Sequence, residues 1–358
     1  MTTLIRTLIA LLLILAGGEI FVRLFVNGPS PQTYDPEIGY SYIPHGELFQ
    51  TKEGRARVRF NELGLNDAEV GPRDARCRVL VVGDSYTTAL QVPSDKNFGS
   101  VAERLDPGLD IVNGGRDGLF LGDAHKVIRR LVPLVKPDFV VYVISEGDVN
   151  DDTQLPGFRV NVDPSTGKIV DAVMQVEGKE TFKEIFGALL NESALMTRLS
   201  AQLQPSAATA AEMFASLQHW SAGSTGAATV ASSAPARPAT EDILAFVFHR
   251  LAASAPTAIL YINVLRYQPD HRASVAPRSQ AAEVVARAAA DRASLKMLDT
   301  APYLIESVIQ KGQPPFGFDN GLLPGGHLNP QGHEAVARAL VDLVHEMQRS
   351  GSNGCHTQ

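Results

Sequence analysis

Continuous apolar runs separated by amphipathic segments dominate the chain from residue 78 onward. The runs are RVLVVG, DIVN, DFVVYVIS and TAILYINV, at 78–83, 110–113, 138–145 and 257–264, and KMLD at 296–299 is a candidate fifth. Runs without polar alternation are typical of strands that are covered on both faces. Helical periodicity fills the segments between them, at 123–135, 240–255 and 279–293. This alternation predicts an α/β fold, a three-layer α/β/α sandwich around a parallel, flavodoxin-like doubly wound sheet.

The other segments suggest how the chain is organised. Residues 28–76 are rich in Pro, Gly and charge, and we expect a neck of short strands that packs on the main domain, residues 77–348. An insertion at 157–239 follows the third strand and is either a lid or a tolerated surface loop. It contains an amphipathic helix or helix pair at 180–203 and an Ala/Ser/Thr-rich, flexible part at about 205–240. Residues 349–358 are a tail.

The first 27 residues predict a signal anchor. Arg6 precedes an apolar stretch that, extended to Val26, reaches roughly 20 residues, about enough to cross a bilayer. The lone cation places the N-terminus in the cytoplasm and the main domain in the periplasm or another extracytoplasmic space. The membrane is then a partner through the N-terminal transmembrane helix. A cleaved signal peptide is the competing interpretation, and a buried helix of a cytosolic protein is less favoured.

Composition narrows the classes of partner. The chain has 358 residues, is 44% hydrophobic and has a formal net charge of −7. No dense Lys/Arg stripe is present, so we expect no nucleic-acid partner. Cys77 and Cys355 match no metal spacing. Two free thiols are slightly favoured over one disulfide, because Cys77 leads into a predicted core strand.

Polar residues at the ends of the predicted strands indicate serine chemistry. Ser85 follows the first strand in GDSY, NGGRDG at 113–118 follows the second, and EGDVND at 146–151 follows the third. His327 lies in the loop before the last helix, where Asn329 is a good N-cap. A serine hydroxyl becomes a nucleophile when a base, usually histidine, removes its proton. The oxyanion that forms then needs N–H donors.

These blocks, in this order, resemble the SGNH (GDSL-type) hydrolases over residues 35–160 and 255–345. DPEIGY and NELGL upstream look like a membrane-anchored bacterial branch of that family. The resemblance implies that Ser85 is the nucleophile and an oxyanion donor, that Gly118 is a second donor, and that His327 is the base. His333 is expected to be a packing residue. We expect no cofactor and no metal, because the acid cluster Asp148, Asp151 and Asp152 is better interpreted as a solvated loop than as a cation site.

Two positions depart from the pattern of the family. Gly147 stands where the oxyanion Asn is expected, and Asn150, the candidate replacement, lies three residues later. No carboxylate stands two or three residues before His327, and Asp319 is the nearest upstream acid. A backbone carbonyl is the alternative orienting group. Loss of one oxyanion donor costs about 10²–10³ in rate and loss of the orienting acid about 10⁴.

We therefore expect an extracytoplasmic serine esterase that acts on an ester-bearing small molecule, a lipid or an O-acylated cell-surface glycan. An O-acyltransferase would use the same site. A catalytically impaired member that binds a glycan or an envelope partner is the alternative from another class. A nucleotide-binding Rossmann protein is disfavoured, because the first strand ends in Gly-Asp-Ser and not in G-x-G-x-x-G.

Overall fold

A five-stranded parallel sheet is the centre of the molecule. The computed structural model describes residues 2–21, 31–35, 37–51, 53–150, 158–174, 238–268, 272–321, 323–350 and 355. The neighbouring strands of the sheet are, in order, β13 (Lys296–Asp299), β10 (Thr257–Ile262), β7 (Phe139–Ser145), β5 (Cys77–Val82) and β6 (Leu109–Asn113). When the five strands are numbered by their order in the chain and the sheet is read from the β6 edge, the order is 2-1-3-4-5. This is the flavodoxin-like order. The predicted fold class and all five predicted strands are confirmed.

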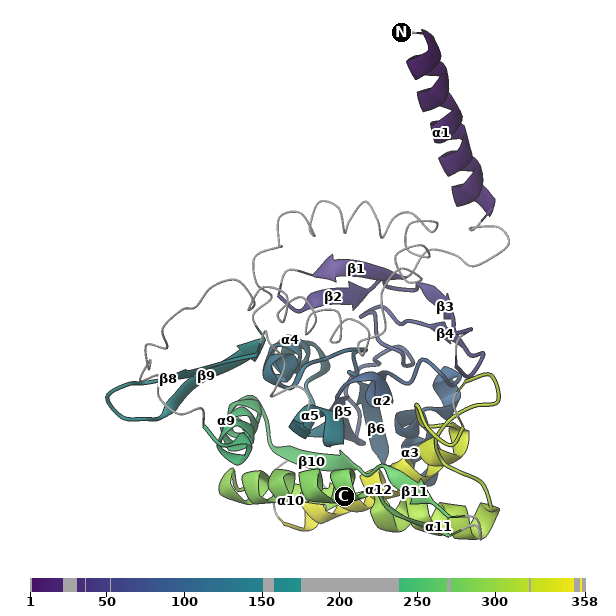
Figure 1. Ribbon diagram of the computed structural model, residues 1–358. Coiled ribbons are helices and arrows are strands. Elements are labelled where there is room, and N and C mark those ends of the chain that lie inside the picture. The colour runs from purple at the N-terminus through teal and green to yellow at the C-terminus, as the bar shows by residue number, and fades with distance from the viewer. Residues whose placement is uncertain are drawn as a thin grey trace. The chain divides into compact units, whose positions relative to one another are not determined.

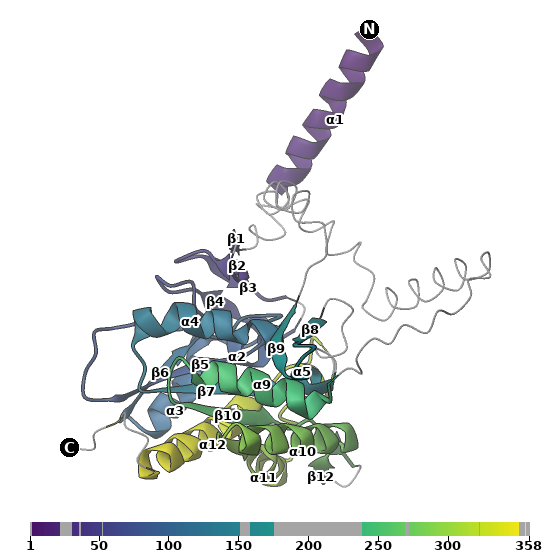
Figure 2. The ribbon, with the colours of Figure 1, turned by 90° about the vertical axis from the view of Figure 1, so that its left-hand side faces the viewer.

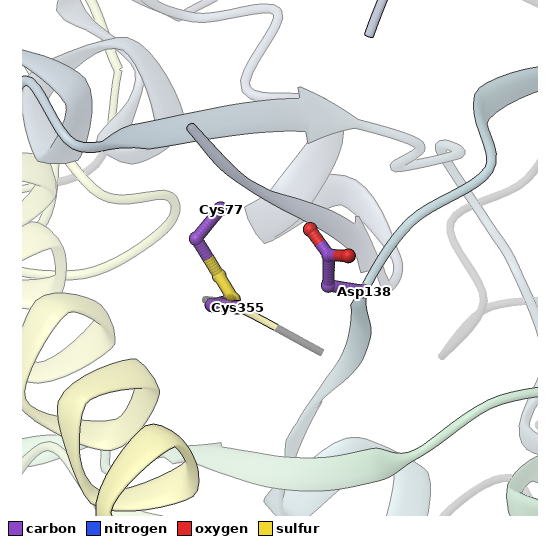
Figure 3. A group of neighbouring side chains, drawn as sticks. All are labelled: Cys77, Asp138 and Cys355. Carbon is purple, nitrogen blue, oxygen red and sulfur yellow. A yellow bond between two sulfur atoms is a disulfide. The ribbon is translucent and has the colours of Figure 1, made fainter. Parts of the chain in front are cut away.

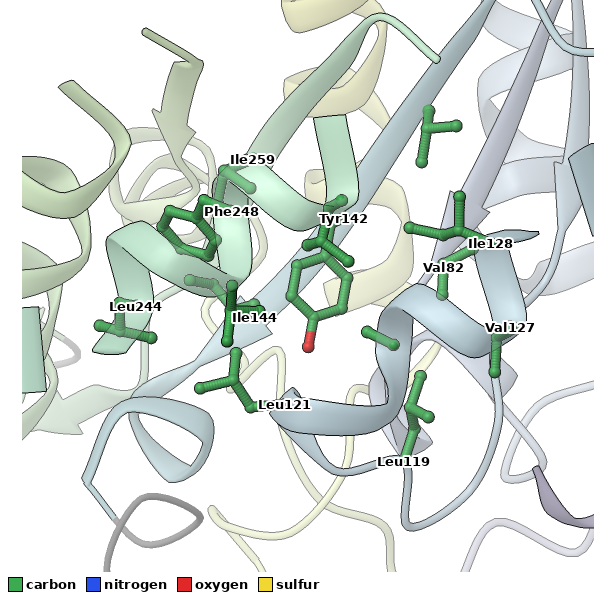
Figure 4. Packing of buried hydrophobic residues seen from close by; sticks show 14 of the residues in the cluster. Val82, Leu119, Leu121, Val127, Ile128, Tyr142, Ile144, Leu244, Phe248 and Ile259 are labelled. Carbon is green, nitrogen blue, oxygen red and sulfur yellow. The ribbon is translucent and has the colours of Figure 1, made fainter. Parts of the chain in front are cut away.

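Helices cover both faces of this sheet (Figure 1, Figure 2). One layer contains α4 (Ala124–Val135), α9 (Thr240–Ala252) and α10 (Pro277–Arg292), and the other contains α3 (Phe98–Leu105), α11 (Ala301–Lys311) and α12 (Pro330–Arg349). Alternate residues of each strand belong to different cores. In β7, Tyr142 and Ile144 face α4 and α9 (Figure 4), whereas Val141 and Val143 belong to the core that includes α12. This two-sided burial explains why the strand sequences show no polar alternation.

The neck consists of two antiparallel hairpins. These are β1 (Gln32–Asp35) with β2 (Gly39–Tyr42), and β3 (Glu47–Phe49) with β4 (Arg57–Arg59). The rings of Tyr42 and Phe60 stack with centroids 4.1 Å apart and form a small core with Leu90 of the main domain. The Asp67 carboxylate accepts a hydrogen bond of 2.7 Å from the N–H of Asn113, at the end of β6. The neck therefore packs against the loops at the carboxyl edge of the sheet.

The main domain also contains two antiparallel hairpins outside the central sheet. β8 (Phe158–Val162) and β9 (Ile169–Met174) pair within the predicted insertion, and β11 (Leu265–Tyr267) pairs with β12 (Ala273–Val275). Phe158 and Ala172 of the first hairpin join the core that contains α4 and α9. The helix predicted at 180–203 and most of the segment predicted to be flexible lie outside the described residues.

The N-terminal segment forms a separate helix, α1 (Thr2–Phe21). Within the described residues, no helix combines the length and the apolar character that crossing a membrane requires. The predicted anchor over residues 1–27 extends beyond α1 to residues that lie outside the described ones, and it stays a prediction.

Cys77 and Cys355 form a disulfide, with Cα atoms 5.1 Å apart (Figure 3). The preference for two free thiols is therefore wrong, because the fold brings the tail back to the start of β5. Asp138 lies beside the two sulfurs, but its carboxylate accepts hydrogen bonds of 2.8 and 2.9 Å from Arg73. Sulfurs bonded to each other offer no thiolate ligands, so this group is a structural cross-link.

Candidate active site

Ser85 begins a short helix at the carboxyl end of strand β5, between β7 and β6. The helix α2 (Ser85–Thr88) is capped by Asp84, whose carboxylate accepts the N–H of Tyr86 at 3.0 Å. A Cβ on Gly83 would lie 2.3 Å from Thr87 Oγ1 and 2.9 Å from the Val143 carbonyl oxygen. Only glycine therefore lets the chain turn so close to β7, and the turn leaves the Ser85 side chain half-buried.

The loop after β6 is fastened to this turn. The N–H of Arg116 donates to the carbonyl of Gly83 at 2.9 Å, and a Cβ on Gly115 would lie 2.3 Å from the backbone nitrogen of Thr88. Gly118, two residues after Arg116, is exposed and has φ +67°. The left-handed conformation favours glycine at this position. The two loops that contain the predicted oxyanion donors are thus in direct contact.

His327 is held by a carboxylate from the neck. Its Nδ1 lies 2.6 Å from Glu53 Oε2, and its backbone N–H donates to Glu53 Oε1 at 2.8 Å. The two side chains are 30% and 17% exposed, respectively. An ionised carboxylate only accepts hydrogen bonds, so Nδ1 carries the proton and Nε2 remains available as a base. This is the geometry in which an acid orients a catalytic histidine.

Asp319 does not orient His327, and that prediction is corrected. Its side chain is 80% exposed and pairs with Arg55 at 3.5 Å. The next residue, Asn320, accepts the N–H of Gly54 at 2.9 Å and donates to the Thr51 carbonyl at 3.2 Å. The loop that contains Asp319 therefore binds the neck segment on both sides of Glu53.

The imidazole lies beside the turn that contains Ser85. Its ring centroid is 5.8 Å from that of Tyr86, the residue that follows Ser85. Electrostatic interactions join His327 to Asp84, the residue that precedes Ser85, and to Asp117, the residue that precedes Gly118. The structure therefore gathers the serine turn, the loop of Gly118, His327 and Glu53 at one edge of the sheet, where doubly wound folds bind ligands.

Two amides of this edge suit an oxyanion. In the described part of the chain, the N–H groups of Ser85 and Gly118 donate no backbone hydrogen bond. Asn150, the predicted third donor, is the half-buried last residue of α5 (Glu146–Asn150), and its contribution stays a prediction. Gly147 lies within the same short helix. The neighbouring Asp148 is buried and accepts the N–H of Ser145 at 2.7 Å.

Burial shapes the charge of the site. It raises the pKa of Asp84 to about 6, against the opposing effect of a charged His327. It also raises the pKa of Asp117, again opposed by His327. Burial lowers the pKa of His333 to about 3. Its ring stacks on that of Phe98, with the two ring centroids 5.8 Å apart. His333 is therefore a neutral packing residue of α12, as predicted.

Sequence reasoning missed Glu53. It lies 274 positions before His327, in a polar turn of the neck that has no periodicity. One indirect signal is the absence of a carboxylate just before His327, which implies that the partner comes from elsewhere in the chain. Gly54, which follows Glu53, and Gly326, which precedes His327, are a second signal. A Cβ on Gly326 would lie 2.3 Å from Glu53 Oε1.

Comparisons with known proteins give matches among solved structures alone. No model of a known protein family matches the chain, and no curated protein matches it. A lipolytic protein of the G-D-S-L family from Veillonella parvula matches at 12% identity and a TM-score of 0.37, over 74% of this chain and 96% of that chain. The esterase EstA from Pseudoalteromonas sp. matches at 10% identity and a TM-score of 0.37, over 76% of this chain and 99% of that chain. The acetyl xylan esterase AlAXEase matches at 15% identity and 0.39, over 75% and 99%.

The first of these structures is a lipolytic protein of the G-D-S-L family, and the other two are esterases. The fold of the present chain is defined by its own strand order.

Proposed function

We propose that this chain is a serine ester hydrolase in which Ser85 is the nucleophile, His327 the base and Glu53 the orienting acid. The observation that supports this most strongly is the 2.6 Å contact between His327 Nδ1 and Glu53 Oε2, next to the turn that contains Ser85. A backbone carbonyl is no longer needed to orient the imidazole. Glu53, an acid of the neck, takes the role of the carboxylate that the sequence lacks just before His327.

The proposed reaction has two halves. In the first, Ser85 Oγ attacks the ester carbonyl while His327 Nε2 takes the hydroxyl proton. The N–H groups of Ser85 and Gly118 stabilise the oxyanion, with Asn150 as a proposed third donor. The C–O bond to the alcohol then breaks, and His327 returns the proton to the leaving oxygen. In the second half, His327 deprotonates a water molecule, whose oxygen attacks the acyl carbon. The bond from that carbon to Ser85 Oγ then breaks, His327 returns the proton to Oγ, and the acyl group leaves as a carboxylic acid.

The proposed location is extracytoplasmic. A disulfide between Cys77 and Cys355 supports this, because such bonds persist in oxidising compartments and are rare in the cytosol. The ester classes proposed as substrates are small acyl esters, lipids and O-acyl groups of cell-surface glycans. No described residue selects one of them.

The rate of p-nitrophenyl acetate hydrolysis by the full chain tests this proposal. We expect Ser85→Ala to abolish the enzymatic rate without changing the melting temperature by more than a few degrees. Ser165→Ala, at an exposed serine in the turn of the β8–β9 hairpin, is the matched control and should keep the wild-type rate. Equal rates in wild type and Ser85→Ala would rule out Ser85 as the nucleophile.

A further inference from the structure

Arg116 is a buried cation without an anionic partner. Its residue is 7% exposed, and within the described residues no carboxylate lies within 4.0 Å of its guanidinium and no acceptor bonds its Nε. Its backbone N–H donates to the Gly83 carbonyl, so the residue belongs to the loop after β6 that contacts the turn of Ser85. Buried charges are costly unless they are paired.

The surroundings of Arg116 do not replace an anion. The guanidinium carbon lies 4.3 Å from the centre of the Tyr40 ring, a cation–π contact that leaves the buried Nε without a hydrogen-bond acceptor. Asp35 is close enough to act electrostatically, but it is paired with Arg130. Burial lowers the pKa of Arg116, which reflects the desolvation of its charge.

A cavity of about 310 Å³ lies against Arg116, between the neck and α4. Most of its wall is apolar and includes Leu65, Val127 and Leu131, which are at most 8% exposed. Its polar border includes Tyr42, Arg130 and Glu62. Pockets of this kind, apolar with a few well-placed polar groups, are typical of small-molecule sites.

We propose that this cavity binds an aliphatic carboxylate, with the carboxylate paired to the Arg116 guanidinium and the alkyl chain against Leu65, Val127 and Leu131. A guanidinium offers a planar pair of N–H donors that matches a carboxylate, and such charge-assisted pairs are stronger than neutral hydrogen bonds. A medium-length alkyl chain suits both the volume and the apolar wall. This site is separate from the ester chemistry of Ser85, and it stands whether or not the chain is a hydrolase.

Calorimetric titration of the full chain with octanoate and with octanamide, its neutral analogue, tests the site. We expect saturable binding of octanoate with a Kd at least about tenfold lower than that of octanamide. Arg116→Met keeps the apolar bulk and should abolish this preference. Ser85→Ala should leave both dissociation constants unchanged.

A second variant covers the case in which Arg116→Met does not fold. Val127→Phe fills the cavity from α4 while Arg116 stays in place. We expect this variant to raise the Kd of octanoate and of octanamide at least about tenfold. Equal affinity of the wild type for octanoate and octanamide would overturn the proposal. So would an unchanged octanoate preference in folded Arg116→Met, or loss of octanoate binding in Ser85→Ala, which would place the ligand at the catalytic serine.

Discussion

At the scale of single residues, Glu53 has two tasks. One carboxylate oxygen binds the ring of His327 and the other binds its backbone N–H. This arrangement sets the position of the loop and the orientation of the imidazole together. An amide at this position preserves the size of the side chain but removes the charge and changes the favoured tautomer of the ring.

The substitution Glu53→Gln tests the role of this acid. We expect the rate of p-nitrophenyl acetate hydrolysis to fall by as much as about 10⁴, since loss of the orienting carboxylate of a triad has that effect. Asp319→Asn is the matched control, and we expect it to keep a rate close to that of the wild type. The assignment fails if the two variants lose activity equally.

A second residue, Asp67, predicts a dependence of stability on pH. Burial raises its pKa to about 7, opposed by hydrogen bonds from the N–H groups of Asn113 and Ala68. The native state therefore holds the Asp67 proton more tightly than the unfolded chain does. The stabilisation that this proton gives is fully present below about pH 4 and is lost as the pH rises towards 7.

The variant Asp67→Asn isolates this contribution. We expect its free energy of unfolding, relative to the wild type, to rise between about pH 4 and pH 7 by on the order of 4 kcal/mol. Urea unfolding of both proteins at pH 4.5 and pH 8 measures the change. A difference between the two proteins that is the same at both pH values would show that Asp67 titrates normally.

At the scale of elements, the strands were the most predictable part of the fold. β5, β7 and β10 are buried on both faces, so their sequences are unbroken apolar runs. The helices α3 and α11 were not predicted. α3 has only 8 residues, and α11 follows β13 after a single residue, so neither stands apart as a long periodic segment. Local pattern thus located the sheet better than its shorter covering helices.

The candidate site was predictable to the extent that its residues follow strands or precede a capped helix. Ser85 and Gly118 lie at strand ends, and His327 lies before the Asn329 cap, as the sequence indicated. Glu53 and the Cys77–Cys355 pair depend on contacts between distant segments. No local periodicity encodes such contacts, so the sequence alone left them open.

The loop before α12 predicts a second effect on activity. Gly326 has φ +88°, and a Cβ there would lie 2.3 Å from Glu53 Oε1. We expect Gly326→Ala to displace the carboxylate and to reduce hydrolysis at least about tenfold. Gly312→Ala is the control, because Gly312 has φ +67° but open space around its Cβ.

Both glycine variants should lose some stability, since alanine is strained at positive φ. Only Gly326→Ala should lose activity when the folded fractions are matched by circular dichroism. Parallel losses of activity in the two variants would mean that backbone strain, and not the position of Glu53, governs the rate.

At the scale of the whole molecule, the neck is part of the site. The predicted boundary of the main domain lies after residue 76, yet the acid that holds His327 lies before that boundary. Two hairpins of the neck pack against loops at the carboxyl edge of the sheet. A chain truncated to start at residue 77 would therefore lose Glu53 as well as its supporting contacts.

The disulfide gives a prediction for the stability of the whole fold. It joins residues 278 positions apart, from the first residue of β5 to the tail. Reduction should lower the free energy of unfolding by about 2–4 kcal/mol. Thermal unfolding with and without dithiothreitol measures this effect, and the double variant Cys77→Ser, Cys355→Ser should not respond to the reductant. An unchanged melting temperature in the reduced wild type would contradict it.

Mapping the residue that a fluorophosphonate probe modifies tests most directly whether Ser85, His327 and Glu53 act as one nucleophilic unit. In the full chain, peptide mass spectrometry should find the probe on Ser85, and His327→Ala, folded to the same extent, should label far more slowly. A wild-type protein left unmodified at Ser85, or one labelled there as fast as His327→Ala, would contradict the account.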